Sequence, residues 1–344
     1  METGIVGATG YGGVELFRLL SGHSEVKNIH LYSSSQAGEF FEEIYTHVNN
    51  QSHELQPLQP EKMKQELDII FLATPPGVSS ELTPKLTGGK AKVIDLSGDL
   101  RLKDPQTYTD WYNNAAAPQS VIEEAVYGLP EWNKENIQSA SVIANPGCYP
   151  TATLLGLGPV IEKQIADPGR IIIDAKSGVS GAGKNASPVT HFAHTQENFR
   201  IYKVNQHKHI PEIEQQLNLW NEASKPVTFS THLVPMTRGI MSTIYVEPVA
   251  DDSLESIHEL YQQTYESHPF VRVRKLGDFP STRDVYGSNY CDIGLALDDR
   301  TGRLTIVAVI DNLMKGAASQ AVQNMNLVSG IEETTGLKHV PVFP

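Results

Sequence analysis

The sequence predicts an α/β protein with a Rossmann-type, doubly wound parallel sheet and a second α+β domain whose sheet is largely antiparallel. Two observations predict the first part: short apolar runs alternate with helical stretches, and glycine-rich or polar turns follow the runs. One observation predicts the second part: from about residue 151 the strand-like runs lengthen, as in an open antiparallel sheet. A chain of 344 residues is long enough for two packed domains.

Five strand-like runs occupy the first part of the chain. They cover residues 4–7, 27–32, 68–73, 92–96 and 141–144. An amphipathic helical stretch at 14–20 follows the first run, and this alternation indicates a parallel sheet. Ligands of doubly wound sheets bind outside the carboxyl ends of the strands. We therefore expect the turns after these runs to carry functional residues.

The later strand-like runs cover residues 170–175, 227–235, 241–248, 294–297 and 304–311. Residues 256–266 look helical, and 315–328 read as a final helix whose apolar face we expect to return to the first domain. Residues 99–125 hold Pro, Asn and aromatic residues, which favours an ordered irregular excursion. The expected domains are 1–147 with about 313–344, and 148–312.

Composition excludes several classes of protein. The formal charge of −13 and the pI near 5.4 disfavour nucleic acid and anionic membranes as partners, although an anionic small substrate responds to local charge only. Cys148 and Cys291 could form at most one bridge, which favours a reducing cytoplasm. The sequence shows neither a signal-peptide pattern nor an apolar run of about 18 residues, so we expect neither a signal peptide nor a membrane-spanning helix.

The most informative segment is 145–151, which reads Asn-Pro-Gly-Cys-Tyr-Pro-Thr. The Pro-Gly pair forces a turn, and an apolar segment at helical spacing follows it. Cys148 is therefore expected where a helix begins. Free backbone N–H groups and the helix dipole would stabilise a thiolate at that position. A thiolate is a strong nucleophile, and a buried structural cysteine is the alternative interpretation.

A glycine-rich turn at 7–13, Gly-Ala-Thr-Gly-Tyr-Gly-Gly, lies between a strand and a helix. Glycines let the backbone approach a pyrophosphate, and the helix N-terminus binds the anion. The spacing is one step off the common dinucleotide fingerprint, and a tight turn without a ligand is the alternative.

Where an NAD enzyme usually carries Asp or Glu after the second strand, residues 33–35 are all serine. This favours NADP, because no carboxylate repels a 2′-phosphate.

Three further features have suitable chemistry. His207 and His209 precede a proline that is typical of a helix start, and a histidine titrating near pH 7 suits a cysteine enzyme. Surface histidines that cap a helix are the alternative.

Residues 176–184 lack the order of an ATP-binding loop, so a glycine loop near a nicotinamide or an oxyanion fits better. Arg101 and Arg238 follow strand ends and could bind an anion, although loop arginines are most often solvated. No ligand cluster has zinc spacing, so no metal is expected.

Together these motifs resemble the N-acetyl-γ-glutamyl-phosphate reductase family, essentially from end to end. The Tyr-Pro-Thr after the cysteine and the His-x-His-x-Pro-Glu-Ile segment look like this family rather than the related aspartate-semialdehyde dehydrogenases. The matching segments are 4–11, 95–101 (Asp-Leu-Ser-Gly-Asp-Leu-Arg), 127–131 (Tyr-Gly-Leu-Pro-Glu), 145–151, 177–183 (Ser-Gly-Val-Ser-Gly-Ala-Gly) and 207–213.

The resemblance implies NADP as cofactor, a catalytic and oligomerisation domain at 148–312, a dinucleotide-binding domain in the rest, and a homo-dimer or homo-tetramer. It implies reductive dephosphorylation of an acyl phosphate in arginine biosynthesis, with Cys148 as nucleophile and His207 as acid/base, His209 being the fallback. The expected cofactor-binding residues are Gly7, Ala8, Thr9, Gly10, Tyr11, Gly12, Ser34, Ser35, Pro75, Ser177, Gly178, Gly181 and Asn312. The expected substrate-binding residues are Arg101, Asn145, His209, Glu212 and Arg238.

In this reaction the Cys148 thiolate attacks the acyl-phosphate carbon, inorganic phosphate leaves, and NADPH reduces the resulting thioester to a semialdehyde. Backbone N–H groups at the helix start can stabilise the oxyanion. Within the same architecture, the alternative substrates are aspartyl phosphate and a carrier-bound aminoadipyl phosphate. A non-catalytic NADP-binding sensor is the alternative from a different class, and the presence of both Cys148 and His207 weighs against it.

Overall fold

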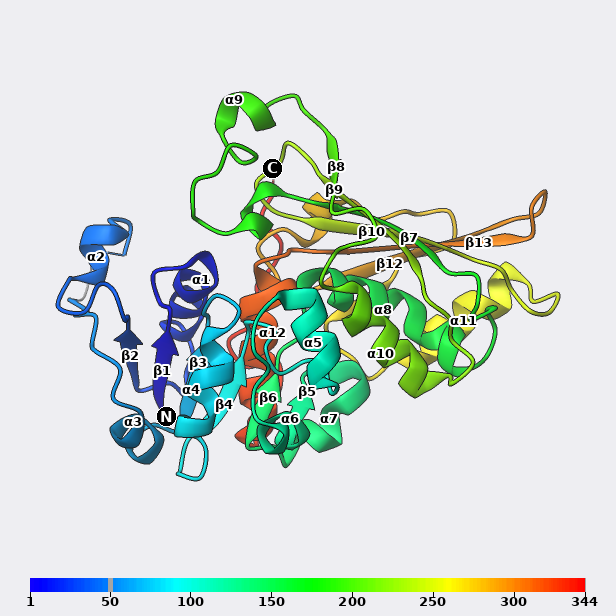
Figure 1. Cartoon of the computed structure of the whole chain (residues 1–344). Helices are drawn as coiled ribbons and strands as arrows, with labels where there is room; N and C mark the ends of the chain where they lie inside the picture. Colours follow the sequence, from blue (N-terminus) through cyan, green and yellow to red (C-terminus); the bar gives the residue numbers. More distant parts are fainter. Residues whose placement is uncertain (49–51, 344) are drawn as a thin grey trace. The chain divides into compact units, whose positions relative to one another are not determined.

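The computed structural model describes residues 1–48 and 52–343, which form two compact units (Figure 1). Unit 1 comprises Met1–Pro146 and Ala317–Lys338, and unit 2 comprises Gly147–Gly316 with the chain end from His339. Each unit contains one large sheet, parallel in unit 1 and mostly antiparallel in unit 2. The predicted fold class is therefore confirmed.

Unit 1 is built on a six-stranded parallel sheet with the order β2-β1-β3-β4-β6-β5. The central strand β3 is buried at all four residues, which explains why its sequence is apolar throughout rather than alternating. The five strands predicted from apolar runs correspond to β1–β4 and β6, whereas β5 was not predicted. The strands are β1 (Glu2–Val6), β2 (Asn28–Tyr32), β3 (Ile69–Leu72), β4 (Lys92–Asp95), β5 (Ala125–Tyr127) and β6 (Val142–Ala144).

The helices of unit 1 are α1 (Tyr11–Leu20), α2 (Phe41–Ile44), α3 (Pro60–Glu66), α4 (Val78–Leu86), α5 (Pro105–Tyr112), α6 (Gln119–Glu124), α7 (Pro130–Gln138) and α12 (Ser319–Val328). The prediction of an irregular excursion at 99–125 is partly wrong, because α5 and α6 lie there. The carboxylate of Asp104 accepts the backbone N–H groups of Gln106 and Thr107, and Pro105 occupies the first helical position. Asp followed by Pro is a local sequence signal for the start of a helix.

Unit 2 has a seven-stranded sheet with the order β11-β12-β13-β10-β7-β9-β8. The pairs β11–β12 and β7–β9 are parallel, and the other neighbours are antiparallel, as the longer strand runs predicted. The strands are β7 (Ile172–Ser177), β8 (Arg200–Tyr202), β9 (Thr228–Leu233), β10 (Ile240–Val246), β11 (Val271–Val273), β12 (Cys291–Asp298) and β13 (Arg303–Ile310).

The helices of unit 2 are α8 (Cys148–Glu162), α9 (Phe192–Thr195), α10 (Ile210–Trp220) and α11 (Leu254–Tyr265), with 3₁₀ turns η1 (Val179–Ala182) and η2 (Thr282–Val285) and a π-helical turn η3 (Met314–Ala318). The central helix α8 is buried almost throughout and packs closely on the sheet, since a Cβ at Gly156 would lie 2.9 Å from Ile244. Pro159 cannot donate to the Leu155 carbonyl, and the Tyr265 hydroxyl donates to it instead. In the described residues, none of the helices has the length and apolar character that crossing a membrane requires.

Candidate active site

Cys148 is the first residue of α8, so the predicted position at a helix start is confirmed. Its side chain is half-buried, whereas Cys291 is fully buried. Gly147 precedes the helix as its N-cap and has no side chain with which to cap it. The thiol therefore lies where backbone N–H groups and the helix dipole favour its ionised form.

A buried carboxylate holds the turn before Cys148. Glu212, in the first turn of α10, accepts a hydrogen bond from the backbone N–H of Gly147 at 2.8 Å, and its side chain is fully buried. Thr151 closes the other side of the turn, since its N–H and its hydroxyl both donate to the Gly147 carbonyl. Glu212, which was predicted to bind substrate, thus supports the backbone next to Cys148.

An aromatic cluster surrounds the residue after Cys148. Tyr149 is buried, and its hydroxyl lies 3.1 Å from that of Tyr202 on β8. The His207 ring packs edge-on against Tyr149 at 5.3 Å between centroids, and it also contacts Tyr202 and Phe229 at 5.7 Å. Burial together with the nearby Cys148 raises the pKa of Tyr202 to about 12, so this hydroxyl stays protonated. The start of α8 and the histidine segment are therefore joined through Tyr149.

The two histidines differ in their surroundings. His207 accepts the backbone N–H of His209 on Nδ1 at 3.2 Å, which places the ring proton of the neutral form on Nε2. Burial, helped by Lys203 and Lys208, lowers the pKa of His207 to about 3. His209 is the N-cap residue of α10, and its ring lies 4.7 Å from the His207 ring and 6.0 Å from the Tyr149 ring. His207 is thus a neutral, buried support for His209.

The π-helical turn η3 packs against Cys148. A Cβ atom built on Gly316 would lie 2.8 Å from the Cβ and 3.2 Å from the Cα of Cys148. Any larger residue at position 316 therefore collides with the start of α8. π-helical turns are rare in proteins as a whole, and those that occur are often found at functional sites.

We expect Gly316→Ala to slow the alkylation of Cys148 by iodoacetamide about tenfold, because displacing the thiol from the helix end weakens the stabilisation of its reactive thiolate. The rate is measured by mass spectrometry of the intact protein. Gly22→Ala is the matched control, since an added Cβ there meets nothing nearer than 3.9 Å. Equal alkylation rates in both variants and the parent protein would show that this contact does not position the thiol.

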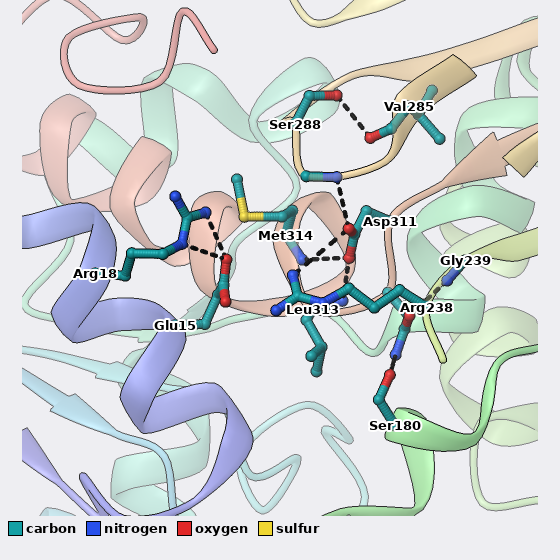
Figure 2. Close-up of polar contacts among 12 residues, drawn as sticks. Glu15, Arg18, Ser180, Arg238, Gly239, Val285, Ser288, Asp311, Leu313 and Met314 are labelled. Carbon is teal, nitrogen blue, oxygen red and sulfur yellow. Dashed lines mark hydrogen bonds and ion pairs between the residues drawn. The ribbon is translucent and has the colours of Figure 1, made fainter. Parts of the chain in front are cut away.

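A polar network at the end of β13 organises the loops that carry Arg238 and the glycine segment 178–183 (Figure 2). Arg238 lies 3.6 Å from Asp311, which is buried and accepts the N–H groups of Leu313 and Met314. Burial raises the pKa of Asp311, and the nearby Arg238 opposes that rise. The Arg238 guanidinium is thereby fixed while part of its surface stays exposed.

Asn312 connects the same two loops. Its Oδ1 accepts the N–H of Gly239, and its Nδ2 donates to the hydroxyl of Ser180 (Figure 2). Gly178 approaches the neighbouring loop so closely that a Cβ atom would lie 2.7 Å from the Thr237 carbonyl oxygen. Ser177 and Gly181 flank this contact, and the Ser177 hydroxyl donates to the Gly178 carbonyl. The first part of the predicted glycine segment, residues 178–180, is therefore packed within unit 2, whereas residues 181–183 are exposed.

The glycine-rich turn of unit 1 has a backbone geometry that is suited to binding an anion. Gly7 has a φ of +78°, and a Cβ on Gly13 would lie 2.4 Å from the Gly7 carbonyl oxygen, so only glycine fits at both positions. Gly10 caps α1 without a side chain, while Ala8 is buried beneath the turn. Free N–H groups at this helix start can receive a pyrophosphate. The remaining predicted members, Thr9, Tyr11 and Gly12, complete the turn and the first residues of α1.

The other cofactor candidates of unit 1 lie in loops after β2 and β3. Ser34 and Ser35 are exposed, whereas Ser33 is buried and accepts the Gln36 N–H. Pro75 lies in the loop after β3, which Asp99 holds by accepting the N–H groups of Gly77 and Ser80. These loops all follow the carboxyl ends of the strands, as the sequence predicted.

Two predicted substrate-binding residues support the loops of unit 1. Arg101 is buried, its Nε donates to the Asn145 carbonyl at 2.7 Å, and its Nη2 donates to the Leu96 carbonyl. The Asn145 side chain donates to the Ala317 carbonyl and accepts from Asn324 on α12. Both side chains thus hold the segment that leads to Cys148.

Sequence reasoning missed three residues that shape the site: Tyr202, Asp311 and Gly316. Asp311 follows directly on the apolar run of β13, and Gly316 lies among small residues at the start of the last helical stretch, so both had a local signal. Tyr202 had none, because its role depends on the pairing of β8 with β9. Across 1–48 and 52–343, no group of three or more His, Cys, Asp or Glu side chains could hold a metal ion.

Two family models match the chain. The one described as "Semialdehyde dehydrogenase, NAD binding domain" matches residues 2–140, and the one described as "Semialdehyde dehydrogenase, dimerisation domain" matches residues 148–312. Curated relatives from Geobacillus sp. (strain WCH70) and Bacillus subtilis (strain 168) are both named N-acetyl-gamma-glutamyl-phosphate reductase. Each is 56% identical over 345 residues, covering 100% of this chain and 100% of the relative.

Solved structures share the architecture at low identity. Aspartate semialdehyde dehydrogenase II of Vibrio cholerae, complexed with ASA, has a TM-score of 0.74 and 21% identity, covering 96% of this chain and 98% of that chain. Aspartate semialdehyde dehydrogenase of Candida albicans, with NADP, has a TM-score of 0.69 and 16% identity, covering 95% and 98%. At such identities the likeness concerns the fold alone, and it agrees with the two sheets described above.

Proposed function

The chain belongs to the N-acetyl-gamma-glutamyl-phosphate reductase family, and we propose that it reduces N-acetyl-glutamyl 5-phosphate to N-acetyl-glutamate 5-semialdehyde with NADPH, in arginine biosynthesis. The observation that carries this proposal is the half-buried Cys148 at the start of α8, joined through Tyr149 to the two histidines. In this proposal unit 1 binds the dinucleotide and unit 2 performs the chemistry. Cys148 and Cys291 carry thiols rather than a disulfide, which supports work in a reducing cytoplasm.

The Cys148 thiolate attacks the acyl-phosphate carbon, and the tetrahedral intermediate expels inorganic phosphate to leave a thioester on the sulfur. Backbone N–H groups at the start of α8 donate to the oxyanion. Glu212 fixes the Gly147 peptide, so these donors keep their direction during the reaction. Arg238, oriented by Asp311, is proposed to bind an anionic group of the substrate. Arg101, Asn145 and Glu212 are proposed to act indirectly: their hydrogen bonds fix the backbone of the segments that lead to Cys148.

We assign the proton transfers to His209 in place of the His207 expected from the sequence. Both histidines are 6% exposed, but the Nδ1 of His207 is already engaged by the His209 N–H, and burial lowers the pKa of His207 to about 3, which makes His207 a poor base. His207 instead accepts the His209 N–H and packs against its ring, which orients His209 at the start of α10. Collapse of the hemithioacetal forms the aldehyde carbonyl and breaks the bond from carbon to the Cys148 sulfur; His209 protonates the departing sulfur and takes the proton back from the resulting thiol before the next turnover.

The dinucleotide is proposed to lie with its pyrophosphate at the turn formed by Gly7, Gly10 and the start of α1. When bound it supplies the hydride that reduces the thioester. Ser34 and Ser35 are proposed to bind the 2′-phosphate, because both are exposed and neither bears a negative charge. Residues of the loop after β3, including Pro75, would border the same molecule.

We expect Ser34→Asp to weaken NADPH binding at least about tenfold, since like charges at contact cost more than 1.4 kcal/mol, while NADH binding changes little. Both affinities are measured by quenching of intrinsic fluorescence. Ser34→Asn is the uncharged control of similar size and should bind both cofactors nearly as the parent does. Equal weakening of both cofactors by Ser34→Asp would place the adenosine ribose elsewhere.

One assay tests the function: phosphate-dependent reduction of NADP with N-acetylglutamate semialdehyde as substrate. Aspartate semialdehyde and a carrier-bound aminoadipate semialdehyde, assayed alongside, distinguish the related acyl-phosphate reductases. A non-catalytic sensor would bind NADPH and turn over none of the three. Turnover with either of the other semialdehydes at a higher kcat/KM would replace the proposed substrate.

A further inference from the structure

The chain ends on a short tail whose contacts lie in unit 2. Residues 339–343, the last that the structure describes, belong to unit 2, although α12 before them belongs to unit 1. The tail is rich in apolar residues, yet Val340, Val342 and Phe343 are all more than half exposed. Such side chains bury little apolar area, so hydrophobic burial does not explain why the tail returns to unit 2.

The tail docks on the η2 segment, by which we mean residues 282–287. The backbone N–H of Val342 donates to the Tyr286 carbonyl at 2.9 Å. Gly287, the next residue, has a φ of +70°, and a Cβ built on it would lie 3.3 Å from the Cγ2 of Val342. The Arg283 guanidinium lies 5.9 Å from the centre of the Phe343 ring. The tail is thus fixed to the η2 segment at its two ends.

The η2 segment also contacts the loop that carries Arg238 (Figure 2). The N–H of Gly287 donates to Oδ2 of Asp311 at 2.8 Å, and the same oxygen lies 3.6 Å from Nη1 of Arg238. Gly239, next to Arg238, packs on the start of the segment, because a Cβ built on it would lie 2.8 Å from the Cβ of Thr282. The loop of Arg238 therefore meets the η2 segment at two places.

We propose that Val342 is a positioning residue for Arg238, and that it acts through the η2 segment and Asp311. Val342 fixes the Tyr286 carbonyl, and the peptide that begins with this carbonyl ends in the N–H that Gly287 donates to Asp311. Without that hydrogen bond the carboxylate is free to turn, and it then holds the guanidinium less firmly in one orientation.

The tail is expected to act on binding rather than on the chemical step. None of the contacts that link Val342 to Arg238 involves Cys148 or the histidine pair. Loss of the tail contact should therefore raise the KM for the anionic reactant that Arg238 binds and leave kcat nearly unchanged. This consequence rests on the proposed function, whereas the structural link between the tail and the loop does not.

Hydrogen exchange of the full chain, followed by mass spectrometry, tests the structural link without any assay of activity. Val342→Pro removes the N–H that the Tyr286 carbonyl accepts. Exchange at 285–288 and 237–240 should become about fivefold faster, the factor that corresponds to one hydrogen bond of average strength. Val342→Ala is the matched control, because it keeps the N–H and should exchange as the parent does.

Steady-state kinetics of phosphate-dependent NADP reduction test the link to Arg238. Arg238→Lys identifies the reactant concerned, phosphate or the semialdehyde, as the one whose KM it raises. Val342→Pro should raise the same KM about fivefold with kcat within about twofold of the parent, and Val342→Ala should leave both unchanged. In the Arg238→Lys background Val342→Pro should add nothing, since its effect passes through the guanidinium.

Four outcomes would each overturn the proposal: parental exchange in Val342→Pro, a lower kcat with an unchanged KM, an additive effect in the Arg238→Lys background, or equal changes in Val342→Ala. If exchange becomes faster while the parent reduces no NADP, the structural link stands and the proposed function fails. If the parent reduces NADP and Val342→Pro matches it in every measurement, the proposed function stands and the role of the tail is wrong.

Discussion

Replacing Cys148 with serine is expected to abolish turnover while NADPH binding stays close to that of the parent. A serine hydroxyl is far less ionised than a thiol at neutral pH, so the helix end that favours a thiolate leaves a serine protonated. Loss of a nucleophile costs several orders of magnitude in kcat, roughly 10⁴ or more. Steady-state rates and a fluorescence titration with NADPH measure the two quantities on the same sample.

Cys291 provides the matched control for this substitution. It is fully buried on β12, so Cys291→Ser is expected to lower the thermal midpoint and leave kcat nearly unchanged. A Cys148→Ser variant that keeps more than about a tenth of the parental rate is incompatible with nucleophilic catalysis by this residue. Loss of NADPH binding in Cys148→Ser would instead point to misfolding of the variant.

The histidine pair gives the second large effect. His209→Asn is expected to lower kcat by about 10²–10⁴ and to remove the acid limb of the pH–rate profile, because the group that exchanges the proton is gone. His207→Asn keeps an acceptor near the position of Nδ1 and should retain the limb, with a loss of about tenfold or less from poorer orientation. The reverse outcome would restore the assignment of His207 that the sequence predicted.

Protein stability gives His207 a readout of its own. Its pKa of about 3 in the folded protein lies below the value of 6.5 that it has when unfolded, so the unfolded chain binds the extra proton. The free energy of unfolding should therefore decrease as the pH falls from 6.5 towards 3. His207→Asn should lessen this decrease, which urea unfolding at several pH values measures. An unchanged pH dependence would show that His207 titrates normally in the fold.

Local signals explain what the sequence predicted well. Strands buried on both faces are apolar, so β3 was readable as a short apolar run and β4 from its buried Val93 and Ile94. The start of α8 was readable because a Pro-Gly turn precedes an apolar helical segment. The turn at Gly7 was readable because several closely spaced glycines after a strand indicate a backbone conformation that other residues rarely adopt. In each case the deciding interactions span only a few residues.

The remaining features depend on contacts between distant segments. Glu212 was expected at the substrate, yet its partner is a peptide N–H 65 residues earlier in the chain. Both histidines are equally buried and both contact Tyr149, and what separates them is the contact of the His207 ring with Tyr202 and Phe229, which the spacing of the two histidines does not reveal. Burial, which sets the pKa of His207, is a property of the assembled unit.

The position of α12 has a consequence for biosynthesis on the ribosome. This helix is buried at nine of its ten residues within unit 1, and Asn324 and Asn326 join it to Gly128 and His23. Unit 1 therefore cannot be completed until α12, near the end of the chain, has been synthesised. By then nearly all of unit 2 has already left the exit tunnel of the ribosome. Because domains fold as they emerge, the unit that bears Cys148 should acquire its structure first, and a nascent chain stalled before Ser319 would expose the surface that α12 covers.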